Sequence, residues 1–305
     1  MSAPKQTVVF AVPGSRRYEN DYFTNNPYSF ANVSITGKEC ARGCAHCKGR
    51  VLEWMTPAPT PERLRLVVDN LTERGCKGLL VSGGADRSGE VPLLPYVDAL
   101  SYARDRGFRV VVHSGLIDQE TARGLKDAGV EQVMLEVVAD EDTIRDVLHM
   151  DCTPEDFLHS MLACRSVGLS IAPHVVIGLH FGSIRSESQA LRTIREAEPR
   201  AVVLVVLQPL RDTPMAAVRP PSVEQVQSIM AVAREYYPDT PLALGCAGPR
   251  GLAKGRIEQI AIDTGMDAIA YPEVGTIAYA ESKGLGWEFS ELCCSLAVGG
   301  ATAKE

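Results

Sequence analysis

Short apolar runs alternate with longer amphipathic segments along most of this 305-residue chain. The run at residues 78–82 is short and almost wholly apolar, which is typical of a parallel strand buried on both faces. We predict eight strands, at residues 33–36, 78–82, 109–113, 132–136, 169–177, 201–207, 242–245 and 268–270. We predict helices between them, at residues 60–74, 92–106, 118–128, 154–167, 187–198, 222–236 and 254–264. This alternation predicts an α/β protein, and eight such units predict a (β/α)8 TIM-type barrel.

The same pattern predicts the domain organisation. Barrels of this length commonly form one domain, so we expect a single domain over residues 1–305. It would carry an N-terminal extension, 1–30, and a C-terminal tail, 285–305. Within the extension, residues 8–12 are a candidate added strand. The alternation also allows a doubly wound open sheet, which is the alternative architecture.

Composition restricts the function classes. Apolar residues make up 45% of the chain and charged residues 23%, which is average for a soluble globular protein. No apolar run reaches the ~20 residues of a membrane span, and the N-terminus lacks a secretory signal, so we expect a cytoplasmic protein that binds no membrane. The net charge of −7 argues against nucleic acid as a partner. Nine cysteines in a reducing compartment indicate metal or redox chemistry rather than disulfides.

Three of the cysteines form a compact motif directly after the first predicted strand. Cys40, Cys44 and Cys47 are separated by three and then two residues. A structural zinc ion takes four protein ligands, and no fourth cysteine or histidine follows at zinc-finger spacing. A [4Fe-4S] cluster can be held by three thiolates, which leaves the fourth iron open for a small molecule. A zinc site that uses His46 or a remote cysteine is the alternative.

The motif C-x3-C-x-aromatic-C, with His46 at the aromatic position, resembles the radical S-adenosylmethionine (SAM) superfamily. The resemblance implies that the three cysteines hold a [4Fe-4S] cluster and that SAM binds its open iron. An electron then cleaves SAM to a 5'-deoxyadenosyl radical. It also implies a barrel that ranges from partial to full within this superfamily.

Candidate cofactor residues follow from the rule that barrel active sites form at the carboxyl ends of the strands. The superfamily's glycine pair, which contacts the SAM amino group, matches Gly83 and Gly84, although Ala85 replaces the usual third residue. Related enzymes contact the SAM ribose or carboxylate near the ends of the third and fourth strands, and an apolar segment with glycine packs on adenine. The predicted cofactor-binding residues are therefore His46, Ser82, Gly83, Gly84, His113, Glu136, Gly178 and Arg211. A hydrogen-bonded core histidine is an equal interpretation of His113, and His174 and His180 are weaker candidates.

The remaining cysteines fall into two groups. Cys76, Cys152 and Cys164 lie in or beside predicted helices and are expected to be inert. Cys246 follows the seventh strand, and Cys293 and Cys294 lie in the tail. Adjacent cysteines are poorly placed to form a disulfide with each other, and free thiols on a tail invite oxidation.

We therefore predict that Cys246, Cys293 and Cys294 hold a second [4Fe-4S] cluster. Related single-chain lipoyl synthases use such a sacrificial cluster as the sulfur donor and a C-terminal serine as a labile ligand, a position that Ser295 resembles. The alternative is a pair of buried thiols beneath Trp287 and Phe289.

Segments across the chain are similar to the biotin-synthase-related subunits of the two-component lipoyl synthase. They include residues 34–40, 82–92, 136–145, 245–251 and 293–295. This resemblance implies sulfur insertion into an octanoyl chain on a protein lysine. The implied partners are an octanoylated lipoyl-carrier protein or peptide, a second radical SAM subunit and an electron donor protein. One alternative is another radical SAM barrel that inserts sulfur into a small substrate or rearranges an amino acid, and another is a non-catalytic iron-sulfur or zinc-binding scaffold.

Overall fold

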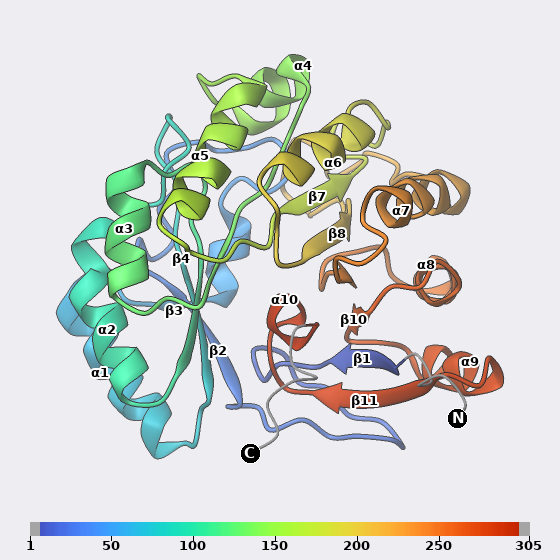
Figure 1. The fold of residues 1–305 in the computed structure, drawn as a ribbon, viewed down its shortest axis with the longest axis horizontal. Coiled ribbons are helices and arrows are strands. Elements are labelled where there is room, and N and C mark those ends of the chain that lie inside the picture. Colours follow the sequence, from blue (N-terminus) through green and yellow to red (C-terminus); the bar gives the residue numbers. More distant parts are fainter. Residues whose placement is uncertain (1–6, 299–305) are drawn as a thin grey trace.

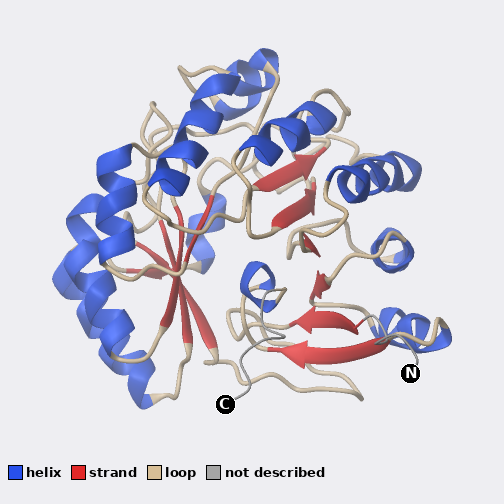
Figure 2. Ribbon diagram, viewed as in Figure 1, coloured by secondary structure: helices blue, strands red, loops and turns tan. Residues whose placement is uncertain are grey.

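Parallel strands surrounded by helices form the wall of an open barrel in the computed structural model, which describes residues 7–298 (Figures 1 and 2). The eight strands expected from the sequence are β2 (Phe30–Ser34), β4 (Gly78–Ser82), β5 (Arg109–His113), β6 (Gln132–Met134), β7 (His174–Ile177), β8 (Val202–Val206), β9 (Leu242–Leu244) and β10 (Ala268–Ala270). β2, β4, β5 and β6 form one parallel sheet, and β7, β8, β9 and β10 belong to a second. Isolated parallel bridges, Val133 to Ile171 and Glu136 to His174, connect the two sheets. The fold is therefore a partial TIM-type barrel.

Two strand boundaries differ from the prediction for local reasons. The first strand begins at Phe30 and ends at Ser34, because a turn follows in which Gly37 takes a positive φ of 62°. The fifth strand begins at His174 rather than residue 169. Pro173, which lacks an N–H donor, precedes it and interrupts the ladder.

The barrel is of the partial kind that the superfamily resemblance allows, and its wall continues beyond the eighth strand. The eighth strand, β10, pairs with β1 (Thr7–Ala11), and β1 pairs with β11 (Gly286–Ser290), all in parallel. Among the described residues, no strand pairing joins β11 to β2 or to the short β3 (Thr56–Pro57). The predicted extension and tail thus supply strands of the wall. Aromatic packing favours this arrangement, because the ring of Phe10 on β1 lies 5.7 Å from that of Phe289 on β11.

Helices cover the outer face of the wall and bury its outward apolar residues. They are α1 (Pro61–Glu73), α2 (Val97–Asp105), α3 (Gln119–Asp127), α4 (Glu141–Thr143), α5 (Pro154–Ser166), α6 (Glu187–Glu196), α7 (Val223–Tyr236), α8 (Leu252–Asp263) and α9 (Val274–Ser282), with shorter helical turns at Arg50–Trp54, Leu94–Tyr96 and Ile144–Leu148. Thr60 caps α1 by accepting from Arg63 N, as its place before Pro61 predicts. None of the helices in residues 7–298 combines the length and apolar character needed to cross a membrane.

The last helix, α10 (Cys294–Ala297), lies inside the barrel (Figure 1). The inward residues of β1, β9 and β10 are small, such as Ala11, Ala243 and Ala268, and they pack with Cys294. On the opposite side, Leu296 packs with Phe30. Small side chains on one half of the wall therefore leave the space that α10 fills. The remainder of the predicted tail, residues 299–305, lies outside the described residues.

Candidate active site

The three-cysteine loop lies at the carboxyl end of β2, where the sequence predicted it. Cys44 and Cys47 are buried and Cys40 is half-buried. Ligand atoms of Cys44, His46 and Cys47 lie within 4.8 Å of one another. A hydrogen bond between the two buried thiols lowers the pKa of Cys47 and raises that of Cys44. These two thiols are thus close together, with one of them more easily ionised.

Backbone contacts hold this loop against the segment after β4 and against the helical turn Ile144–Leu148. Ala41 N donates to Ala85 O at 3.1 Å, and Ala45 N donates to Val147 O at 2.7 Å. Cys40 Sγ lies 3.8 Å from Ala85 O. Gly84 is essential to this packing, because a Cβ there would overlap the Glu39 carbonyl and the Cα of Cys40. The glycine expected to contact a cofactor therefore also lets the loop approach β4.

We expect Gly84→Ala to displace the cysteine loop and destabilise the protein by about 1–3 kcal/mol, the usual cost of overpacking against backbone. Iron content after anaerobic reconstitution should fall clearly below that of the wild type. Gly275→Ala on α9 is the matched control, because a Cβ there meets no atom within 4 Å. Equal iron content in the two variants would contradict this role of Gly84.

A cavity of about 300 Å³ opens beside the cysteine loop. Of the predicted cofactor residues, His46, Ser82, Gly83, His113 and Glu136 line it. The Nδ1 atom of His46 is buried and has no hydrogen-bond partner among the described residues. A buried polar atom without a partner is typical of a site that binds a further group.

Some polar groups at this cavity already have protein partners. Ser82 Oγ donates to His113 O at 2.9 Å, and Gly84 N donates to Thr36 Oγ1 at 2.6 Å. Sequence reasoning missed Thr36, and it also missed Met150 and Phe157, which line the cavity. The last two come from the segments after β6, and an apolar residue in such a segment carries no signal that distinguishes it from core packing.

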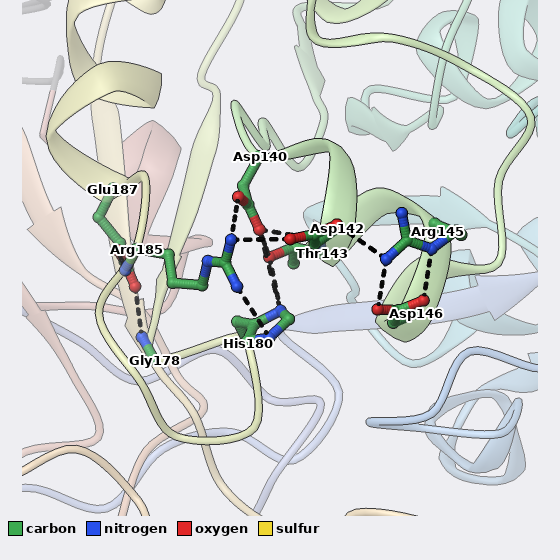
Figure 3. A network of polar contacts seen from close by, with 9 residues as sticks. All are labelled: Asp140, Asp142, Thr143, Arg145, Asp146, Gly178, His180, Arg185 and Glu187. Carbon is green, nitrogen blue, oxygen red and sulfur yellow. Dashed lines mark hydrogen bonds and ion pairs between the residues drawn. The ribbon is translucent and has the colours of Figure 1, made fainter.

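Gly178 lies outside this cavity and belongs to a polar network at the rim of the barrel (Figure 3). Its N–H donates to Glu187 Oε1 at 2.8 Å. Arg185 pairs with Asp140 at 3.0 Å and with Asp142 at 2.9 Å. The network joins the loops after β6 and β7, and it also includes the candidate His180, whose Nδ1 lies 3.0 Å from Thr143 Oγ1. Gly178 thus has a structural partner, and no cavity-lining position supports its predicted contact with adenine.

Arg211 also lies away from the cavity, on an exposed loop after β8. Its carbonyl accepts from Arg50 Nη1 at 2.7 Å, and Arg50 also pairs with Asp212. The loop therefore contacts the helical turn after the cysteine motif through its backbone and through Asp212. Arg211 therefore has no cavity-lining position that would support its predicted role in cofactor binding.

The three other candidate cysteines come from two distant segments. Cys246 lines a small cavity of about 50 Å³ at the carboxyl end of β9, and α10 carries Cys293 and Cys294 into the barrel. Cys246 is exposed, and Tyr271 lines the same cavity and packs in the cluster that includes Cys293 and Cys294. Ser295 Oγ lies 3.5 Å from Cys293 Sγ. Cys294 is buried among apolar residues, as in the alternative of buried thiols, and the second cluster stays a prediction.

Comparison with known proteins places this site in a class. Residues 34–197 match the radical SAM superfamily. The chain is 25% identical to the biotin synthase of Aquifex aeolicus over 254 residues, which cover 79% of this chain and 74% of that protein. It is 26% identical to the biotin synthase of Syntrophotalea carbinolica, covering 81% and 76% of the two chains.

Solved structures show the same fold. The methylornithine synthase PylB superposes with a TM-score of 0.60 at 15% identity, over 85% of this chain and 72% of that chain. The hydrogenase maturase HydG from Carboxydothermus hydrogenoformans superposes with a TM-score of 0.63 at 13% identity, over 96% and 70%.

An open parallel barrel with a three-cysteine loop at the carboxyl end of a strand defines an enzyme that works with an iron-sulfur cluster. The family match is decisive, and the chain belongs to the radical SAM superfamily. Its cofactors are a [4Fe-4S] cluster and SAM, and the residues present fit them: three thiols lie beside a cavity in which a histidine nitrogen has no protein partner. Superfamily membership favours an enzyme over the non-catalytic scaffold.

Proposed function

We propose that this radical SAM enzyme inserts sulfur into an octanoyl chain carried on a protein lysine, as a subunit of a lipoyl synthase in lipoate biosynthesis. The observation that carries the proposal is the position of α10 inside the barrel, where Cys293 and Cys294 pack in one cluster with Tyr271, which also lines the cavity of Cys246. Sulfur insertion requires a sulfur donor, and an iron-sulfur cluster on these thiols would supply it. The relatives named biotin synthase support a reaction that forms carbon–sulfur bonds.

The residues around the cavity would have different roles in binding the cluster and SAM. Cys40, Cys44 and Cys47 would hold the first cluster, and His113 and Glu136 would orient SAM from the ends of their strands. When bound, the cluster and SAM supply a 5'-deoxyadenosyl radical that removes a hydrogen atom from an unactivated carbon.

The protein's own contribution is to exclude water and to hold one C–H bond in position. Leu80, Leu148 and Met150 line the cavity and make part of its wall apolar. The proposed partners are an octanoylated lipoyl-carrier protein or peptide, a second radical SAM subunit and a protein electron donor.

The test is anaerobic turnover with SAM, a strong reductant and an octanoyl-lysyl peptide. We expect 5'-deoxyadenosine together with peptide whose mass has increased by sulfur. The assay is run with and without the second subunit. Formation of 5'-deoxyadenosine without any sulfur-containing peptide in either condition would reject the lipoyl synthase assignment and keep the radical SAM class.

A second candidate function is sulfur insertion into a small free substrate. The similarity to biotin synthases over more than three quarters of the chain favours it. Turnover with the sulfur-free precursor of biotin distinguishes the two candidates. Biotin formed in place of a sulfur-containing peptide would select the second.

A further inference from the structure

Two histidines face each other inside the barrel. His113 is the last residue of β5 and lines the cofactor cavity, and His174 is the first residue of β7. Their ring centroids lie 5.5 Å apart. Both side chains point inward, because the neighbouring residues Val112 and Val175 pack in the outer core and successive strand residues face opposite sides.

Glu136 is level with His174 and lies two residues beyond Met134, the register partner of His113. It forms an isolated parallel bridge with His174, and it lines the cavity together with His113. Two strands, β5 and β7, and the segment directly after β6 thus each present a polar side chain to the interior. The next strand, β8, presents Val203, which is the register partner of His174. The inner wall therefore changes from polar to apolar between β7 and β8.

The pKa values of both imidazoles are lowered, which favours their uncharged forms. Burial lowers the pKa of His113. Burial and the adjacent His113 lower the pKa of His174 to about 3, against a small opposing effect of the Ala172 carbonyl. His174 Nδ1 nevertheless has no partner at hydrogen-bonding geometry among the described residues. Buried polar groups are normally paired, so this side chain is more typical of a binding site than of a core.

An uncharged imidazole offers one hydrogen-bond donor and one acceptor, and it cannot neutralise the charge of a bound ligand. A substrate carboxylate here would meet two neutral rings and the carboxylate of Glu136. An amide is uncharged and both donates and accepts. An acyl amide also has a polar group next to an apolar chain. The inner wall has the same order, with polar His174 on β7 next to apolar Val203 on β8.

We propose that His174 binds the amide that joins the substrate's acyl chain to lysine, while the adjacent His113 faces the cofactor cavity. This inference rests on the function proposed above and assigns a substrate subsite within the barrel. Glu136 and the cysteine loop remain on the cofactor side of the cavity. The subsite selects acyl amides over free carboxylic acids.

The experiment measures equilibrium binding by calorimetry to the anaerobically reconstituted enzyme with SAM and without reductant. The probes are an octanoyl-lysyl peptide, the same peptide with an ester oxygen in place of the amide N–H, and octanoate. We expect His174→Leu to weaken binding of the amide peptide about tenfold and of the ester about twofold or less, since the removed hydrogen bond has a typical net value. His174→Gln should restore part of the difference. Affinity for SAM and iron content should match the wild type.

The outcomes separate the two proposals. If the wild type binds neither peptide, the proposed function fails, and this inference fails with it. If the wild type binds the amide peptide and His174→Leu binds it equally well, or loses amide and ester affinity to the same extent, only the inference is wrong. Tighter wild-type binding of octanoate than of the peptide also overturns it. Should His174→Leu lose iron, His174→Phe, which keeps a ring, is compared in the same way.

Discussion

Replacing Cys40, Cys44 and Cys47 together by alanine is expected to reduce SAM cleavage to the level of a control without enzyme. The cluster that delivers the electron would lose all its protein ligands in this variant. Thermal unfolding should remain cooperative, because the apolar core between the wall and the helices lies mostly outside the loop. The measurement is 5'-deoxyadenosine formed under anaerobic conditions with a strong reductant.

The matched control replaces Cys76, Cys152 and Cys164 by alanine. These cysteines lie outside the cavity, and burial raises the pKa of each thiol, which makes them poor metal ligands. This control should retain SAM cleavage. Undiminished 5'-deoxyadenosine from the first triple variant would contradict the assignment of the cluster to the loop.

Replacing Cys246, Cys293 and Cys294 together by alanine is expected to abolish the sulfur-containing product while 5'-deoxyadenosine still forms. These residues would hold the cluster that donates sulfur, and they lie apart from the three-cysteine loop. Product analysis by mass spectrometry and quantification of 5'-deoxyadenosine in the same reaction measure the two effects.

Iron analysis tests the second cluster directly. The variant without Cys40, Cys44 and Cys47 should keep about four iron atoms per chain after anaerobic reconstitution, as one [4Fe-4S] cluster requires. That iron should disappear when Cys246, Cys293 and Cys294 are also replaced. If the first triple variant already binds no iron, the second cluster does not exist and the sulfur comes from another source.

Local sequence was sufficient for most of the wall. The strands at residues 78–82, 109–113 and 268–270 lie where the apolar runs predicted them. Strands buried on both faces need continuous apolar runs, so the sequence itself reveals them. The cysteine loop could be predicted equally well, because its three thiols are close in sequence and follow a strand end.

The positions of the polar candidates depended on contacts that sequence spacing does not specify. Ser82 and His113 end their strands and line the cavity, whereas Gly178 and Arg211 come after the ends of theirs and do not. Glu187 accepts a hydrogen bond from the N–H of Gly178, and Arg50 donates one to the carbonyl of Arg211. A strand-end position brings a residue to the right face of the barrel, and side-chain packing then decides whether it faces the cavity.

The sequence by itself determined the parallel α/β wall, the radical SAM motif and the placement of that motif at the carboxyl end of a strand. Only the tertiary structure decided how the barrel ends. Residues 7–11 and 286–290 are nearly the full chain apart, and pairing between them depends on exposed strand edges and aromatic contacts rather than on local pattern. It also decided that α10 enters the barrel, because the space for this helix exists only where the small inward residues of β1, β9 and β10 come together.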